Sequence, residues 1–304
     1  MQLYKPFGFF LTLLYHFRQR QKIIGAESFF HDMPFAIQEL QSAYKAYRQF
    51  LDRSASPHHA RYIFPFFTGS YFAYRKADVA RVVAIAKALS SNATYLDVGC
   101  GYGDFLKHVR EFLPNAEGIE KEGAIFYSFN VPKPDFISLT PVEAFTQPVD
   151  VVFVGWMEPG QDFRKSVARF ASKCVITTFD AGGQCGINGA CEYDEFGFNR
   201  IAWWRTPSWI DVNAELMNRY YTPTLSSEKK EQLAHLRSAH NFWYVYARPE
   251  FASAVQTALE SWLEKEDPGD RFVFESVLDE CGFGYKQELP ALTSGSNLWE
   301  VIFD

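Results

Sequence analysis

The fold of this chain is decided by one stretch, which reads Tyr95-Leu96-Asp97-Val98-Gly99-Cys100-Gly101-Tyr102-Gly103-Asp104. Apolar residues over 94–98 predict a strand, three alternating glycines predict a tight turn, and apolar residues at helical spacing over 103–113 predict a helix. The glycines let the backbone turn sharply and let a ligand approach it closely. The N–H groups of the first helical turn would then point at that ligand. The stretch therefore predicts a site for an electron-rich or anionic ligand.

The next predicted strand, 116–119, is followed by an acid, Glu120. In a doubly wound sheet, an acid at this point lies beside the first glycine turn and can accept hydrogen bonds from both ribose hydroxyls of a nucleoside. A dinucleotide-binding turn reads G-x-G-x-x-G and would need glycine at position 104, where this chain has Asp104. The strand also carries Asp97, whose charge would oppose a pyrophosphate but suits the cationic aminoacyl end of S-adenosylmethionine.

The run from Asp97 to Gly103, together with Glu120, resembles the first two motifs of class I S-adenosylmethionine-dependent methyltransferases. The resemblance continues in 149–155 as the fourth strand and 174–179 as the fifth. It ends in 274–282 as the last helix and in 285–289 and 298–303 as a closing antiparallel strand pair. It covers 71–180 and 271–304, roughly half the chain. The resemblance implies an α/β fold, a Rossmann-like doubly wound sheet of seven strands whose C-terminal pair is antiparallel.

The chain is expected to divide into four regions around this sheet. Residues 1–70 form an N-terminal helical cover, because 35–51 has the pattern of an amphipathic helix. Residues 71–180 form the S-adenosylmethionine-binding core, and 271–304 complete it. The span 181–270 is an insertion after the fifth strand. It is expected to act as a lid or substrate-specificity region, since long insertions commonly carry function.

Within 181–270 the patterns predict helices over 211–221, 226–239 and 249–265 and a strand over 241–247. Nearer the core, a helical stretch over 123–129 follows the second strand, and a helix over 161–172 follows the fourth.

The resemblance implies S-adenosyl-L-methionine as the cofactor and assigns residues to it by position. The residues implied for the aminoacyl and ribose side are Asp97, Gly99, Cys100, Gly101 and Gly103. Glu120, with Lys121 beside it, is implied to bind the ribose hydroxyls, and Gly155 and Trp156 to border the methyl group.

Two further contacts stay open at this point. Tyr74 and Arg75, just before the first strand, are candidates for the cofactor carboxylate, although Arg75 is equally a solvated charge at a helix start. The adenine contact falls to Glu143 or to a backbone group near Val142, because the family's usual acid after the third strand is missing here.

The catalytic residues are not predicted by these motifs. A methyl group carried on a sulfonium is already activated, so much of the catalysis is positioning and no fixed triad is required. Glu158, Asp180 and His240 are candidate bases, although ordinary structural roles are favoured for each of them. The loop after the fourth strand is not the Asn/Asp-Pro-Pro-Tyr/Phe sequence of enzymes that methylate planar nitrogens, which argues against base and glutamine methylation.

Composition limits the partners. Aromatic residues make up 17% of the chain, which indicates either an aromatic-rich core or an aromatic-lined pocket for an apolar or cationic substrate. The net charge of −6 argues against general nucleic-acid binding, which leaves a basic footprint. Five cysteines without a C-x-x-C pair predict no metal site. An odd cysteine count without a signal peptide fits a reducing compartment, so we expect a cytoplasmic protein.

The N-terminus carries an apolar run, 7–14, flanked by basic residues. It is too short for a bilayer, which needs about 20 residues. The run is either a helix packed on the protein's own core or an interfacial segment that gives residues 1–20 a peripheral membrane contact.

The sequence thus predicts a methyltransferase acting on a small-molecule or lipid-like acceptor. Two alternatives remain: a catalytically silent S-adenosylmethionine-binding regulatory protein and an NAD(P)-dependent oxidoreductase.

Overall fold

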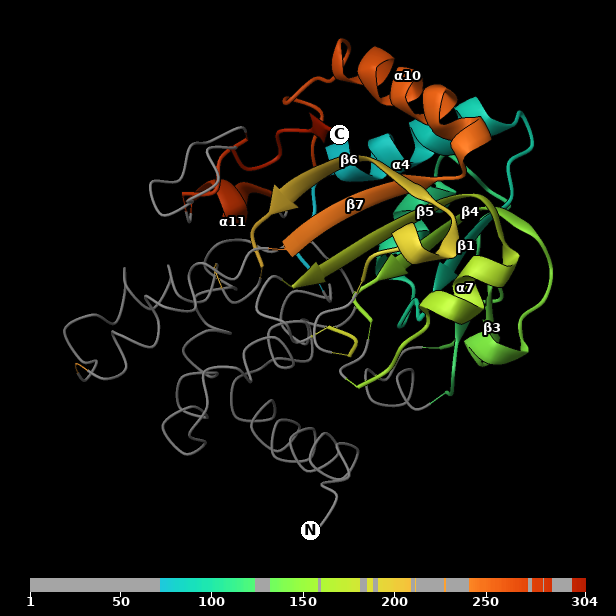
Figure 1. Cartoon of the computed structure of the whole chain (residues 1–304). Coiled ribbons are helices and arrows are strands. Elements are labelled where there is room, and N and C mark those ends of the chain that lie inside the picture. Colours follow the sequence, from blue (N-terminus) through green and yellow to red (C-terminus); the bar gives the residue numbers. More distant parts are fainter. Residues whose placement is uncertain are drawn as a thin grey trace, which may run out of the picture.

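The computed structural model describes residues 72–123, 132–157, 160–180, 185–187, 191–208, 211, 227, 241–272, 275–280, 282–285 and 297–304. Within these ranges the centre of the molecule is one eight-stranded sheet with the order β3-β2-β1-β4-β5-β7-β6-β8 (Figure 1). The strands are β1 (Tyr95–Val98), β2 (Glu117–Glu120), β3 (Ile137–Leu139), β4 (Val149–Gly155), β5 (Ala171–Asp180), β6 (Asn199–Thr206), β7 (Asn241–Ala247) and β8 (Ile302–Phe303).

The sheet is doubly wound. Strands β1 to β5 are parallel, and β7 pairs antiparallel with both β5 and β6. The chain proceeds outward from β1 through β2 to β3, and then outward in the other direction from β4 to β5. The order therefore reverses between β1 and β4. In open sheets of this kind, ligands bind outside the carboxyl ends of the strands at such a switch point.

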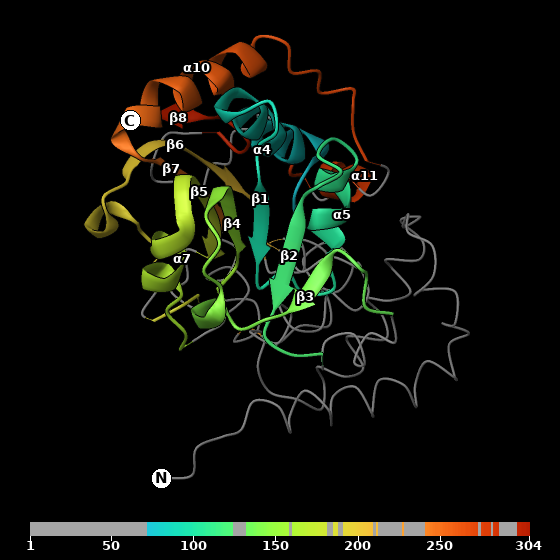
Figure 2. The same cartoon turned by 90° about the vertical axis from the view of Figure 1, so that its right-hand side faces the viewer.

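Helices cover both faces of the sheet (Figure 2). On one face, α4, α5 and α10 pack over residues such as Val151 and Phe153 of β4. On the other face, α7 packs over Val152 and Val154. The alternation along β4 is what a strand buried on both sides requires, because successive side chains point to opposite faces. The helices are α4 (Lys76–Leu89), α5 (Asp104–Arg110), α7 (Arg164–Phe170), α10 (Ala252–Leu263) and α11 (Glu275–Glu280), with short 3₁₀ turns η3 (Val142–Ala144), η4 (Asp194–Phe196) and η6 (Pro249–Phe251).

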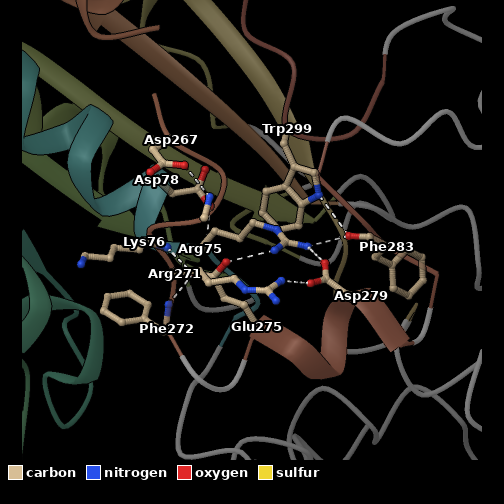
Figure 3. A network of polar contacts seen from close by, with 11 residues as sticks. Arg75, Lys76, Asp78, Asp267, Arg271, Phe272, Glu275, Asp279, Phe283 and Trp299 are labelled. Carbon is tan, nitrogen blue, oxygen red and sulfur yellow. Dashed lines mark hydrogen bonds and ion pairs between the residues drawn. The ribbon is translucent and has the colours of Figure 1, made fainter. Parts of the chain in front are cut away.

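A buried ionic network joins α4 to α11 and the C-terminal segment (Figure 3). The guanidinium of Arg75 contacts Glu275 at 3.0 Å and Asp279 at 2.6 Å, and its carbon lies 4.6 Å from the centre of the Trp299 ring. It also donates a 2.9 Å hydrogen bond to the carbonyl oxygen of Phe283. These partners lie about 200 residues away along the chain, so the network fixes the last helix against the first helix of the core.

A second buried cluster lies further along α4, around Arg81. The fully buried Arg81 makes two 2.9 Å contacts with the carboxylate of Glu266 and one of 3.4 Å with Asp78. Asp78 also accepts a 2.7 Å hydrogen bond from the indole of Trp204 on β6. Burial raises the pKa of Asp78 to about 6, although Arg81 opposes the shift.

The predicted doubly wound α/β fold class is confirmed, although the described residues form eight strands instead of the predicted seven, and most predicted elements are present. The strand over 241–247 is β7, and the helix over 249–265 is η6 followed by α10. The helix over 161–172 is shorter than predicted, because β5 already begins at Ala171. Four predicted regions lie wholly or almost wholly outside the described residues: 1–70, 123–129, 211–221 and 226–239. The first of them includes the apolar run and its predicted membrane contact.

The closing strand pair was predicted wrongly. The antiparallel strands beside β5 are β7 and then β6. Of the predicted pair, 286–289 lies outside the described residues, and 298–303 supplies only the short β8 at the edge. Both strands come from the span predicted to be an insertion, so 199–206 and 241–263 belong to the sheet and its cover. Strand β6 was missed because its sequence does not alternate between apolar and polar residues, and Trp204 and Arg205 are both buried. No helix in the described ranges is long and apolar enough to cross a membrane.

Candidate functional site

The site lies where three neighbouring parallel strands end. Strand β1 leads into the glycine turn, β2 beside it ends at Glu120, and β4 on its other side ends at Gly155. The register pairs Asp97 with Gly118 of β2 and with Phe153 of β4. All nine residues assigned to the cofactor therefore lie at or just beyond the carboxyl ends of β2, β1 and β4, at the switch point of the sheet.

The glycine turn has the backbone that its sequence predicts. Gly99, Gly101 and Gly103 all have positive φ, at 67°, 58° and 83°. This left-handed region strains residues that carry a Cβ atom. The N–H of Gly103 donates to the carbonyl oxygen of Cys100 at 2.9 Å, which closes a tight turn before α5 begins at Asp104. A side chain at Gly103 would also meet Ile137 of β3 at 2.7 Å.

The carboxylate of Glu120 is turned toward the glycine turn. Its Oε2 atom accepts a 2.9 Å hydrogen bond from the N–H of Gly101, and its Oε1 atom accepts one of 2.9 Å from the N–H of Lys121. The side chain of Lys121 is exposed. The predicted placement of an acid beside the turn is therefore what the structure shows.

Three carboxyl groups, those of Asp97, Asp104 and Glu120, lie close together at this site. Asp97 is 3% exposed, and its pKa is raised well above its usual value by burial and by the nearby charges of Asp104 and Glu120. Either protonation or a bound cation relieves the repulsion between these neighbouring carboxylates. The arrangement therefore favours a positively charged ligand over a phosphate.

The side chain of Cys100 lies beneath the turn instead of facing outward. A Cβ atom on Gly118 would come within 2.7 Å of both the Cys100 sulfur and Leu106 of α5. The backbone N–H of Cys100 donates to the carbonyl oxygen of Ile119. Burial raises the pKa of the thiol well above its usual value. Cys100 thus packs the turn against β2.

The end of β4 is a strained segment. Trp156 has φ of 69°, a left-handed value that is costly for a residue with a side chain. Its N–H donates a 2.9 Å hydrogen bond to the carbonyl oxygen of Thr178 on β5, which holds this backbone in place. Its half-buried indole packs against the cluster of Phe179, Cys185 and Cys191. The indole is therefore directed along the sheet toward β5.

Sequence reasoning missed three residues around the site. Phe163, just before α7, lies 3.9 Å from where a side chain on Gly99 would begin. Leu139 is 48% exposed at the end of β3, in register with Glu120. Asp104 adds a third charge to the site. No sequence motif points to Phe163 or Leu139, but Asp104 lies inside the glycine-containing stretch 95–104 and could have been predicted from it.

Several other candidates lie elsewhere. Tyr74 is buried in the core against Phe105, and the guanidinium of Arg75 is held by Glu275 and Asp279, so their proposed contact with a cofactor carboxylate is wrong. Val142 is buried and Glu143 is exposed in η3, and the adenine contact predicted for Glu143 or for a backbone group near Val142 stays a prediction.

The candidate bases stay untested. Glu158 and His240 lie outside the described residues, and Asp180 is the last residue of β5. No group of three or more metal-binding side chains gathers in the part of the chain that the structure describes.

The sequence matches no known family model and no curated protein. Solved structures do resemble the fold. One is a geranyl diphosphate C-methyltransferase from Streptomyces coelicolor A3(2) in complex with Mg²⁺, geranyl diphosphate and S-adenosyl-L-homocysteine, at 13% identity and a TM-score of 0.41, covering 57% of this chain and 80% of that one. Another is a putative sarcosine dimethylglycine methyltransferase from Galdieria sulphuraria, at 13% identity and a TM-score of 0.40, covering 57% and 84%. A third is the [4+2]-cyclase SpnF, at 14% identity and a TM-score of 0.37, covering 60% and 82%.

These likenesses are too distant to establish an activity, and the fold rests on the chain's own topology. Strands β1 to β5 are parallel, and their order reverses beside the glycine turn. Beyond β5, strand β7 pairs antiparallel with β5, and β6 pairs antiparallel with β7. The chain therefore has the doubly wound α/β fold that its resemblance to class I S-adenosylmethionine-dependent methyltransferases implied.

Proposed function

We propose that this protein is an S-adenosylmethionine-dependent methyltransferase that acts on a small or apolar acceptor. One observation carries the proposal: the carboxylate of Glu120 is held at the N–H of Gly101, next to the buried Asp97, at the switch point of the sheet.

The residues at this point fit S-adenosylmethionine. Glu120 would accept hydrogen bonds from the ribose hydroxyls, and the turn through Gly99 and Gly101 has no side chains to keep a ligand away from the backbone. Leu139, exposed beside Glu120, offers an apolar surface for the adenine ring. Asp97 and Asp104 would stabilise the positive charges of the aminoacyl end. When bound, the cofactor supplies a methyl carbon activated by its sulfonium.

The chain's own contribution to the chemistry is positioning. Strand β4 ends beside the glycine turn, and Gly155 lies so close to Phe153 and Phe72 that a side chain there would meet them at 2.7 Å and 3.3 Å. The backbone of 155–156 would border the methyl group, with Phe163 beside it excluding water. Holding an acceptor in line at such a border accounts for much of the rate of a displacement reaction.

The oxidoreductase alternative fits the site less well. A dinucleotide needs N–H groups of the glycine turn for its pyrophosphate. Here the N–H of Gly101 donates its hydrogen bond to Glu120, and the carboxylates of Glu120 and Asp104 would repel a phosphate.

Isothermal titration calorimetry of the whole chain with S-adenosylhomocysteine and with NAD tests the proposal. We expect saturable binding of S-adenosylhomocysteine and none of NAD. Binding of NAD with comparable or greater affinity would overturn the assignment. A protein that binds neither compound would do the same.

A further inference from the structure

A set of aromatic side chains continues from the candidate site across three strands on one face of the sheet. It begins after β4 and crosses β5, β7 and β6. We call it the aromatic row; its members are Trp156, Phe179, Phe242, Tyr244 and Trp203.

The strand registers place these side chains together. Phe179 of β5 pairs with Phe242 of β7, and Phe242 pairs in turn with Arg205 of β6. Tyr244 and Trp203 form the next pair on the same face, two residues further along each strand. Directly paired residues project to the same side of a sheet, so the row is a consequence of register.

The rings are in contact with one another. Phe179 stacks on Phe242 with centroids 5.7 Å apart and planes at 18°, and meets Tyr244 edge-on at 4.8 Å. Trp203 lies 6.0 Å from Phe242 at an angle of 41°. Such contacts hold the rings in fixed positions and leave a continuous apolar surface.

The row differs from an ordinary core by its exposure. The aromatic residues on the opposite face of the same strands, Trp204 and Trp243, are completely buried. In the row, Trp156, Trp203, Phe242 and Tyr244 are only half-buried. The strands therefore keep accessible aromatic rings on one face only.

Positive charges lie on the row's own face. The Arg200 guanidinium lies 4.8 Å from the centre of the Tyr244 ring and is ion-paired with Asp304. Arg205 lies beside Phe242 and is 4% exposed. A ring that already faces a guanidinium, as Tyr244 does, is a poor partner for another cation, because its negative face is taken and the two cations repel.

The row starts where the reacting methyl group is expected. Trp156 directly follows Gly155 at the end of β4, and β4 is the immediate neighbour of β1 and its glycine turn. From these observations we propose that the aromatic row binds the methyl acceptor, and that this acceptor is a planar apolar molecule, neutral or anionic, instead of a cation. The inference rests on the proposed function, since it places the acceptor relative to the S-adenosylmethionine site.

Calorimetry on the whole chain, saturated with S-adenosylhomocysteine, tests this with two planar probes: neutral 2-naphthol and cationic N-methylquinolinium. Phe242→Leu removes a ring from the row and keeps an apolar side chain. Phe112→Leu, an exposed aromatic just beyond α5, is the matched control. Trp203→Leu repeats the test if Phe242→Leu fails to fold.

We expect 2-naphthol to bind the wild-type protein at least tenfold more tightly than N-methylquinolinium. Loss of one ring contact should weaken 2-naphthol binding about three- to tenfold in Phe242→Leu and leave it unchanged in Phe112→Leu. The affinity for S-adenosylhomocysteine should stay the same in both variants. No binding of 2-naphthol, equal binding in Phe242→Leu, or tighter binding of the cation would overturn the proposal. If only the probes fail, the cofactor assignment stands; if S-adenosylhomocysteine itself does not bind, both fail.

Discussion

The Oε2 atom of Glu120 accepts a 2.9 Å hydrogen bond from the backbone N–H of Gly101, 19 residues earlier in the chain. The bond joins the end of β2 to the middle of the turn that follows β1. Because the other oxygen is fixed by the N–H of Lys121, the carboxylate is oriented at the turn by the protein alone. An acid positioned in advance loses less entropy when it binds a ligand, which is the physical advantage of preorganisation.

The turn depends on a glycine in the neighbouring strand. We expect Gly118→Ala to destabilise the protein by about 1–3 kcal/mol, since the added methyl group would overlap the Cys100 sulfur and Leu106, both at 2.7 Å. Urea denaturation measures the loss. Gly123→Ala is the control, because its new methyl group would lie 3.5 Å from Leu139, an ordinary contact distance. Equal stability of the two variants would show that the turn does not pack on β2 as described.

Cofactor binding should release protons. Burial, Asp104 and Glu120 raise the pKa of Asp97 in the free protein, and a bound cation would lower it again. The affinity for S-adenosylmethionine should therefore rise with pH between the pKa of Asp97 in the bound protein and its pKa in the free protein. The rise should be steeper than for S-adenosylhomocysteine, which lacks the sulfonium charge. Calorimetry in buffers of different ionisation enthalpy counts the protons. Asp97→Asn should abolish their release, and a buffer-independent enthalpy for the wild-type protein would contradict this electrostatic account.

The buried ionic cluster on α4 should matter far more to stability than an exposed ion pair. We expect Arg81→Met to cost about 3–5 kcal/mol, because it leaves the carboxylates of Asp78 and Glu266 buried without their guanidinium. Arg200→Gln, which breaks the partly exposed pair with Asp304, should cost about 0–1 kcal/mol. Chemical denaturation of both variants gives the comparison. Similar losses in the two would mean that burial is not what gives the Arg81 cluster its importance.

Asp78 should make stability depend on pH. Its pKa is about 6 in the folded protein against an ordinary 3.8, so its contribution to stability is complete below pH 4 and is lost as the pH rises through 6. The stability of the wild-type protein relative to Asp78→Asn should therefore fall by about 2 kcal/mol between pH 4 and pH 7. Denaturation curves of both proteins across this range measure the difference. A difference that stays constant with pH would show that Asp78 titrates normally.

The sequence was sufficient for the parts of the fold that local pattern determines. Strands β1, β2 and β4 and the turn through Gly99 and Gly103 follow from apolar runs and glycine spacing, which need no knowledge of distant residues. The charge network of Arg75 was not predictable, since its partners Glu275 and Asp279 come from about 200 residues away. The aromatic row was hidden for the same reason, because it arises only when β7 inserts between β5 and β6.

The central claim is that Glu120 holds the ribose of a sulfonium nucleoside at the glycine turn. Calorimetry with S-adenosylhomocysteine on the wild-type protein, Glu120→Ala and Glu122→Ala tests it most directly. Glu122 is an exposed acid two residues further on and serves as the control for net charge. We predict that Glu120→Ala weakens binding by about 1–3 kcal/mol, the cost of losing hydrogen bonds to a charged group, while Glu122→Ala leaves it unchanged. Unchanged affinity in Glu120→Ala, or equal losses in both variants, would contradict the account.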